Sequence, residues 1–172
     1  MKRSLAAIGL VLGLTAPSAA QSPEEPAPLL KGLGTVMIQV VAPIVIGHER
    51  AELTATSLQS LAEGTLQKNG VPLFHFGRDR FEPGRPFPTN LFLTVTVVNS
   101  PTGPRGYFVN LKLMEPVTLS RGEKGSNNAT TWDRGLSGPA DRTDLVRLIQ
   151  EAVGRVCHTF STEYAAANPK GK

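Results

Sequence analysis

The chain has 172 residues, of which 40% are hydrophobic and 19% are charged, and its formal net charge is +4. This length and composition suit one globular domain with its own hydrophobic core. The small positive charge is spread along the chain, which argues against a nucleic-acid partner, and the single cysteine excludes a disulfide bond within the chain.

Residues 1–20 have the three-part pattern of a secretory signal peptide. Two basic residues precede an apolar run, Leu5–Leu14, and the small residues Ser18–Ala20 follow it. A helix needs about twenty apolar residues to span a bilayer, so this run is too short for a membrane span. We therefore expect Sec-type export and cleavage near Ala20, which would place the protein in the periplasm or the external medium.

Loss of residues 1–20 also changes what is expected of the remaining chain. Lys2 and Arg3 are two of its 18 basic residues, against 14 acidic ones, so the net charge falls from +4 to +2. No cysteine follows the apolar run, so the residue needed for lipid attachment is missing. We expect a soluble protein with no lipid anchor and no membrane span.

Composition divides the rest of the chain into three parts. Residues 21–34 contain three prolines and two glycines, which predicts a disordered, Pro-rich tether. Residues 35–167 carry the periodic apolar patterns of a single α+β domain. Residues 168–172 begin with Asn-Pro, which stops a helix, so a frayed tail is expected there.

The first half of the domain predicts a strand, a helix and a second strand. Apolar residues alternate along Thr35–Ile46, as they do in a strand. In Thr54–Asn69 they recur at helical spacing, and Asn69-Gly70 is a suitable stop. Val71–Phe76 predicts a short second strand, and the prolines and glycines of residues 77–89 predict an irregular loop.

The second half predicts a hairpin, a last strand and a long helix. Asn90–Asn99 and Tyr107–Leu119 both alternate around a Pro- and Gly-rich turn, which is typical of an antiparallel hairpin with one buried face. A polar turn at residues 121–128 and a short strand at Ala129–Arg134 follow. Asp141 is the expected N-cap of a helix with a nearly continuous apolar stripe that runs to about residue 167.

The expected element order is therefore β-α-β-β-β-β-α. Each helix has one apolar stripe and each longer strand one apolar face. Such elements bury these surfaces by packing in two layers. We expect an α+β two-layer sandwich, with both helices on one face of an antiparallel or mixed sheet.

Recognisable catalytic and metal-binding motifs are missing. The three histidines, His48, His75 and His158, are not at metal-chelating spacing, and no nucleophile elbow, phosphate loop or dinucleotide fingerprint is present. Cys157 falls on the apolar stripe of the last helix and is best explained as a small buried hydrophobe. We assign no catalytic residue, no cofactor and no metal. An enzyme site assembled from dispersed residues stays open, with His75 or His158 as candidates.

The loop after the second predicted strand has the composition of a binding segment. Phenylalanines and arginines interleave there, namely Phe76, Phe81 and Phe87 with Arg78, Arg80 and Arg85. An arginine beside an aromatic ring can hold an anionic or planar group through paired hydrogen bonds and stacking. The candidate binding residues are Arg78, Arg80, Arg85, Phe81 and Phe87. The alternative is that the phenylalanines pin the loop over the sheet while the arginines are solvated or paired with Asp79 and Glu82.

The single tryptophan, Trp132, lies in the last short strand. Its ring is either a ligand platform or an anchor that holds this strand under the final helix. The second interpretation is favoured, because large aromatic side chains mostly contribute to packing.

The region from about Gly34 to Pro169 resembles a group of uncharacterised exported bacterial proteins. The shared features are a valine-rich hairpin, a Met-Glu-Pro-Val-Thr-Leu-Ser-Arg return strand, Ala-Thr-Thr-Trp-x-x-Gly and an amphipathic helix ending in Ala-Asn-Pro. The resemblance implies export but no established activity, so no catalytic residue follows from it. More loosely, the element order looks like small periplasmic domains such as the amino-terminal domain of the translocation protein TolB and envelope-assembly lipoproteins, which is an analogy of fold alone.

Together these features predict an exported, soluble, non-enzymatic binding or envelope-accessory domain. Its contact surface would be the solvated sheet face or the segment Phe74–Phe87, which we call the Arg/Phe loop. Its partner would be an envelope protein or an anionic ligand. The alternative function is a small-molecule hydrolase with a site built from dispersed residues. A third possibility is self-assembly through an exposed strand edge.

Overall fold

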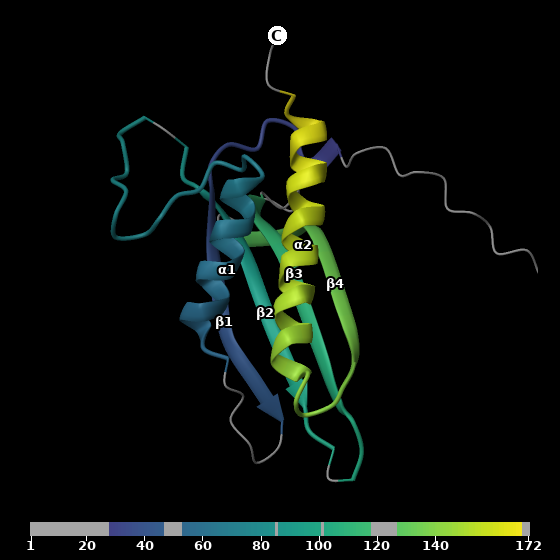
Figure 1. The fold of residues 1–172 in the computed structure, drawn as a ribbon. Coiled ribbons are helices and arrows are strands. Elements are labelled where there is room, and N and C mark those ends of the chain that lie inside the picture. The colour runs from purple at the N-terminus through teal and green to yellow at the C-terminus, as the bar shows by residue number, and fades with distance from the viewer. Residues whose placement is uncertain (1–27, 47–52, 85, 101, 118–126, 170–172) are drawn as a thin grey trace, which may run out of the picture.

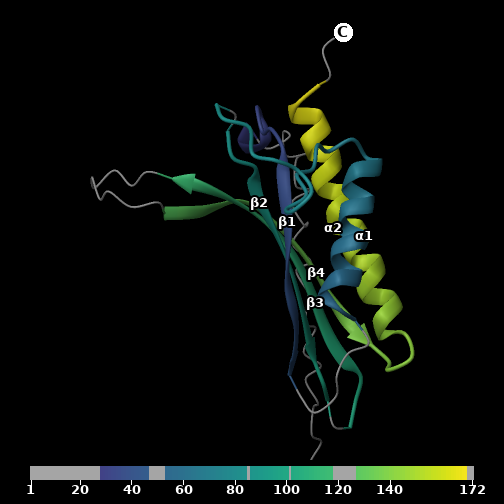
Figure 2. The ribbon, with the colours of Figure 1, turned by 90° about the vertical axis from the view of Figure 1, so that its left-hand side faces the viewer.

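The computed structural model describes residues 28–46, 53–84, 86–100, 102–117 and 127–169. These residues form one four-stranded sheet, two α-helices and a short 3-10 helix. In chain order the elements are η1 (Pro28–Leu30), β1 (Val36–Ile46), α1 (Ala55–Lys68), β2 (Thr89–Val98), β3 (Arg105–Val117), β4 (Asn127–Ala140) and α2 (Leu145–Ala167). Both α-helices lie on the same face of the sheet (Figures 1 and 2). The expected α+β fold in two layers is confirmed.

The sheet is mixed, with the strand order β1-β2-β3-β4. β1 and β2 are parallel, and α1 lies in the crossover between them that a parallel pair requires. The other two pairs are antiparallel, so the predicted hairpin is present as β2 and β3. The β3–β4 register shifts between Leu113 and Met114, and beyond this point the two strands project away from the helices (Figure 2).

The alternating pattern of β2 places one row of side chains in the core. Leu91, Leu93, Val95 and Val97 are at most 1% exposed, whereas the intervening residues lie on the open face. Their partners on β3 continue the same layer, with Val95 opposite Val109 and Leu93 opposite Leu111. Successive strand residues point to opposite faces, so this register buries one complete face of the hairpin under the helices.

Both helices contribute one apolar face to this core. On α1 the buried residues are Leu58, Ala62 and Leu66, and on α2 they extend from Leu145 to Ser161. Thr54 and Ser57 form a reciprocal capping box that satisfies two backbone amides at the start of α1. Within the described part of the chain, neither helix has the length and apolar character required to cross a membrane.

The predicted strand Val71–Phe76 is reduced to a single bridge. The Val36 amide donates to the Pro72 carbonyl at 3.0 Å, and the Phe74 amide donates to the Val36 carbonyl at 2.9 Å. Pro72 has no amide hydrogen to extend this ladder, and the chain turns at Gly77, where φ is +86°. The sheet formed by the described residues therefore has four strands, not five.

The last strand is much longer than predicted. β4 extends to Ala140 and so includes Gly135, Gly138 and Pro139, which were expected to lie outside a strand. Proline is tolerated because β4 is an edge strand. A Cβ at Gly135 would lie 3.1 Å from the Phe108 ring, and one at Gly138 would lie 3.1 Å from the Tyr107 hydroxyl, so aromatic side chains of β3 occupy the space above both glycines.

The prediction that Asp141 is the N-cap of the last helix is also wrong. The Asp141 carbonyl accepts hydrogen bonds from the amides of Asp144 and Leu145, and α2 begins only at Leu145. Asp144 occupies the N-cap position and makes no side-chain capping bond. Of the predicted polar turn, residues 121–126 lie outside the described residues, and the following asparagines already belong to β4.

Parts of the expected tether and tail contact the domain and each other. Within the expected tether, Leu30 is fully buried and Leu33 is 8% exposed. Asn168, expected in the frayed tail, accepts a hydrogen bond from the Gly32 amide at 2.8 Å and donates to the Leu30 carbonyl at 2.7 Å. Burial of two leucines and these hydrogen bonds hold residues 28–34 against the end of α2; residues 21–27 lie outside the described residues.

Trp132 anchors β4 to α2, as its sequence position favoured. The ring is 4% exposed and packs edge-on against Phe160 with 5.0 Å between ring centroids. Its Nε1 donates to a Glu163 oxygen at 2.6 Å, and the Arg134 guanidinium lies 3.4 Å from the other carboxylate oxygen and 5.6 Å from the Trp132 ring centre. A buried indole N–H needs such an acceptor.

We expect Glu163→Ala to lower the free energy of unfolding by about 1–3 kcal/mol, because it leaves the Trp132 N–H unpaired in the core. The matched control is Glu151→Ala on the same helix, whose partner Arg147 is exposed and whose loss should have little effect. Urea denaturation followed by circular dichroism measures both. Equal stability of the two variants would contradict a stabilising role for Glu163.

Two glycines should respond in opposite directions to replacement by alanine. Gly154 lies inside α2, and a Cβ added there would meet open space, so Gly154→Ala should stabilise the protein by about 0.5–1 kcal/mol. Gly135→Ala should destabilise it, because the new methyl group would press on Phe108 and Asn110. Thermal unfolding of the two variants checks both signs.

Candidate functional site

The Arg/Phe loop connects the Val36–Leu73 bridge to β2 and is held at its base by a tight turn. The His75 amide donates to an Asp79 carboxylate oxygen at 2.7 Å, and the amides of Arg78 and Asp79 donate to the His75 carbonyl at 3.1 and 3.0 Å. His75 Nδ1 also lies 3.5 Å from a Glu63 oxygen on α1. The base of the loop is thus fixed to the sheet and to the first helix.

Three phenylalanines form a row along this loop. The Phe81 ring lies 4.6 Å from the Phe74 ring and 5.3 Å from the Phe87 ring, measured between centroids. Phe74 is half-buried, but Phe81 is 50% exposed and Phe87 is 81% exposed. Phe76 is 79% exposed as well. Only the inner end of the row packs on the domain, so the aromatic residues do not all pin the loop over the sheet.

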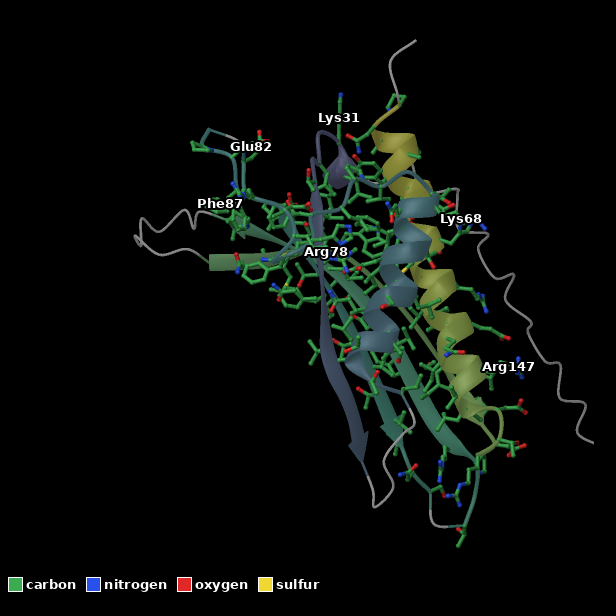
Figure 3. All side chains as sticks on the ribbon, turned by 60° about the vertical axis from the view of Figure 1, so that its left-hand side comes forward. Lys31, Lys68, Arg78, Glu82, Phe87 and Arg147 are labelled. Carbon is green, nitrogen blue, oxygen red and sulfur yellow. The ribbon has the colours of Figure 1, made fainter. Side chains whose placement is uncertain are left out.

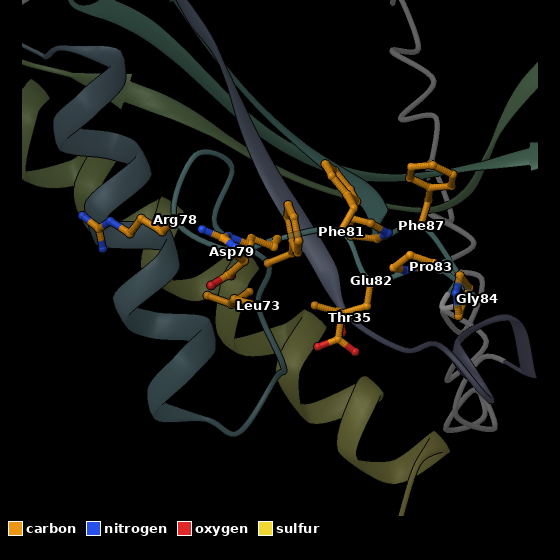
Figure 4. Close-up of a pocket in the computed structure, with 13 residues that line it drawn as sticks. Thr35, Leu73, Arg78, Asp79, Phe81, Glu82, Pro83, Gly84 and Phe87 are labelled. Carbon is orange, nitrogen blue, oxygen red and sulfur yellow. The ribbon is translucent and has the colours of Figure 1, made fainter.

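A groove of about 790 Å³ lies within the loop and is bounded below by Thr35 (Figure 4). Four of the five candidate binding residues line it, namely Arg78, Arg80, Phe81 and Phe87. The fifth, Arg85, lies outside the described residues. Asp79 and Glu82 line the same groove, which makes its wall a mixture of aromatic, cationic and anionic groups.

The described arginines of the loop have no side-chain partner within the described residues. Arg78 and Arg80 are exposed, and neither side chain makes a hydrogen bond or ion pair within the described part of the chain. One Asp79 oxygen is instead occupied by the His75 amide. Figure 4 shows the Arg78 side chain directed away from Phe81 and Phe87, so it flanks the aromatic row.

A smaller cavity of about 280 Å³ joins the loop to the segment after η1. It is lined by Leu29, Lys31 and Phe87, and by Glu115 from the projecting end of β3. Figure 3 shows Lys31 at the same end of the molecule as Glu82 and Phe87. The sequence had placed Leu29 and Lys31 in a tether, so their approach to the loop was not predicted. Burial of their neighbours Leu30 and Leu33 brings them there.

The open face of the sheet is the second surface that the sequence suggested. It carries exposed apolar side chains, among them Val41, Val98 and Phe108. Two of its polar side chains share one acidic partner: Asn110 Nδ2 donates to Asp133 at 2.5 Å, and Lys112 lies 3.7 Å from the same carboxylate. This face therefore offers fewer uncommitted charged groups than the loop does.

The residues considered for catalysis lie apart. His75 contacts Glu63, whereas His158 is exposed on α2, and His48 lies outside the described residues. Within the described residues, neither imidazole ring is hydrogen-bonded to a serine, threonine or cysteine side chain, and no three His, Cys, Asp or Glu side chains are placed to hold a metal ion. Cys157 is buried as expected, and burial raises the pKa of its thiol to about 12.

Comparison with known proteins gives structural similarity at low sequence identity. No protein-family model matches the chain, and no curated protein matches it. Among solved structures, a dodecameric PelC variant from Paraburkholderia phytofirmans is 17% identical, with 76% of this chain and 91% of that chain covered and a TM-score of 0.45. A minor lipoprotein from Acinetobacter baumannii is 12% identical (79% and 93% covered, TM-score 0.34). A hypothetical protein from Chlamydia trachomatis is 6% identical (77% and 99% covered, TM-score 0.41). We draw no functional conclusion from similarity at this level.

The Cys157 thiol should be unreactive in the folded protein. A raised pKa keeps it protonated, and the thiolate is the reactive form, so a disulfide reagent at pH 8 should label it only after unfolding in urea. The thiol of the unfolded chain ionises above about pH 8.5, whereas the folded state keeps its thiol protonated there. The free energy of unfolding should therefore fall as the pH rises above about 8.5. Rapid labelling without urea would contradict the burial of this residue.

Proposed function

We propose that the protein is an exported, non-enzymatic binding or envelope-accessory domain that holds its partner at the Arg/Phe loop. The observation that carries the proposal is a single groove that Arg78, Arg80, Phe81 and Phe87 all line. The two guanidinium groups have no acidic partner within the described residues, and Phe87 is 81% exposed. Both guanidinium groups can therefore bind a ligand by exchanging water for its acceptor atoms, without breaking an ion pair within the described part of the domain.

The chemistry of the groove supports an anionic group as the ligand or as part of the partner. A guanidinium presents several N–H donors in a plane and forms paired hydrogen bonds with carboxylate or phosphate oxygens. Phe81 and Phe87 add apolar surface to the same groove, so a ligand with both an anionic and an apolar part would suit it. We include Arg85 in the binding set, because its position in the sequence places it between Gly84 and Pro86 of the same loop.

The arrangement of the loop also suits a binding role. Its base is fixed by the bridge at Val36 and by the turn at His75, while its tip stands clear of the sheet (Figures 1 and 4). Binding residues concentrate on loops that a rigid scaffold displays in this way. We further propose that residues 1–20 are removed on export, so that the loop works in the periplasm or the external medium.

The triple variant Arg78→Ala/Arg80→Ala/Arg85→Ala should lose partner capture while keeping its thermal stability. The processed protein is crosslinked in the native cell envelope, and crosslinked peptides are identified by mass spectrometry. We expect capture through residues 74–88 to fall at least about tenfold, since each charged hydrogen bond contributes on the order of 1.5–3 kcal/mol. The melting temperature should change by less than about 2 °C, because the described side chains of this set are exposed.

The matched control removes the same charge from the helices, as Lys68→Ala/Arg147→Ala/Arg155→Ala (Figure 3 labels Lys68 and Arg147). Capture by this variant should equal that of the wild type. Unchanged capture by the loop variant would remove the loop from the proposed function. Equal losses in both triple variants would show an effect of net charge alone.

A further inference from the structure

Three exposed apolar side chains from two distant segments line the two neighbouring cavities, and we call them the apolar tip. It consists of Leu29, Phe81 and Phe87, which are 56%, 50% and 81% exposed. The rings of Phe81 and Phe87 lie 5.3 Å apart, and Leu29 lines the smaller cavity together with Phe87. Exposure of large apolar side chains next to one another is unfavourable in water and marks a surface that acts on something else.

The rim of the two cavities beside the apolar tip carries charged groups of both signs. The cavities on its two sides are lined by three cationic side chains, Lys31, Arg78 and Arg80. They are also lined by three carboxylates, Asp79, Glu82 and Glu115. The rim therefore carries no net charge among the described residues. A zwitterionic phospholipid surface has the matching composition, with a phosphate and an ammonium group in each headgroup.

The loop has fewer backbone amides that would lose hydrogen bonds to water in an apolar environment than a loop without proline. Pro86 and Pro88 flank Phe87, and Pro83 precedes Gly84, whose φ of +87° turns the chain. Each proline removes one amide hydrogen that would need a hydrogen-bond partner in an apolar environment. The free-energy cost of bringing this segment to the headgroup–acyl boundary is lower than for a loop with all its amides.

The size of the apolar tip favours a lipid surface over a protein. Two partly exposed phenylalanines and one leucine offer on the order of 400 Å² of apolar area. A stable protein interface takes about 800 Å² from each partner and needs a complementary shape. A fluid bilayer needs no shape complementarity, and protruding single rings insert into it individually.

We propose that the apolar tip docks the protein on a phospholipid bilayer, with Phe81, Phe87 and Leu29 inserted at the interface and Arg78 and Arg80 on headgroup phosphates. This inference rests on the proposed function, because it names the chemistry of the partner held by the same loop. Insertion of the apolar side chains supplies most of the binding.

The test is flotation of the processed protein, with removal of residues 1–20 verified, on phosphatidylethanolamine/phosphatidylcholine vesicles. We expect the wild type to float with the vesicles. Phe81→Ala/Phe87→Ala should float at least about tenfold less well, since each buried ring is worth about that factor. Val98→Ala/Phe108→Ala is the control, because it removes two exposed apolar side chains (48% and 44% exposed) from the open sheet face, and it should float like the wild type.

Circular dichroism establishes that each variant is folded, and Phe87→Ala alone serves if the double variant is not. Failure of the wild type to float overturns the inference, as does undiminished flotation of the Phe81/Phe87 variant. Release of the protein from vesicles by inorganic phosphate overturns it too, since it would indicate a site for free phosphate. The proposed function is tested separately: loss of a crosslinked protein in the arginine variant, without flotation of the wild type, would keep the loop as a protein-binding site.

Discussion

Burial of the inward faces of β2 and β3 under two helices determines where every other described part of this protein lies. The β2 row from Leu91 to Val97 is at most 1% exposed, and α1 and α2 cover it from one side. Strand side chains alternate between faces, so the same register that fills the core fixes which residues remain on the open face. Both helices cover the same face of the sheet, so the opposite face and the Arg/Phe loop remain exposed to solvent.

The ends of the domain complete this core and thereby create the candidate site. Leu30 and Leu33 enter the core beside the last turn of α2, and the Asn168 side chain bonds to the Leu30 carbonyl and the Gly32 amide. As a consequence, Leu29 and Lys31 lie next to the loop and line one cavity together with Phe87. The candidate site is thus formed by tertiary packing between segments far apart in the sequence. Its position is fixed because the neighbouring leucines are buried in the core.

The amino-acid pattern predicts the central hairpin and both helices, because their periods of 2 and 3.6 are long and uninterrupted. It does not predict the second half of β4, where Gly135 and Gly138 suggest a loop; only the rings of β3 above them explain why glycine is required in a strand. Leu30 was missed because two leucines among prolines show no period. The loop residues were found from composition, but their grouping with Leu29 depends on three-dimensional contacts that no local pattern encodes.

Two arginine–aromatic clusters in this chain differ in whether the domain itself supplies partners for their polar groups. Around Trp132, the indole N–H and Arg134 both contact Glu163, and the ring is buried against Phe160, so few groups are left to gain from a ligand. In the loop, Arg78 and Arg80 have no acidic partner within the described residues, and Phe87 is largely exposed. The residue types are similar, and the difference lies in whether the domain itself satisfies them. Exposed guanidinium groups are hydrated, and they can exchange that water for the carboxylate or phosphate oxygens of a ligand, which is the property on which the proposed binding role of the loop depends.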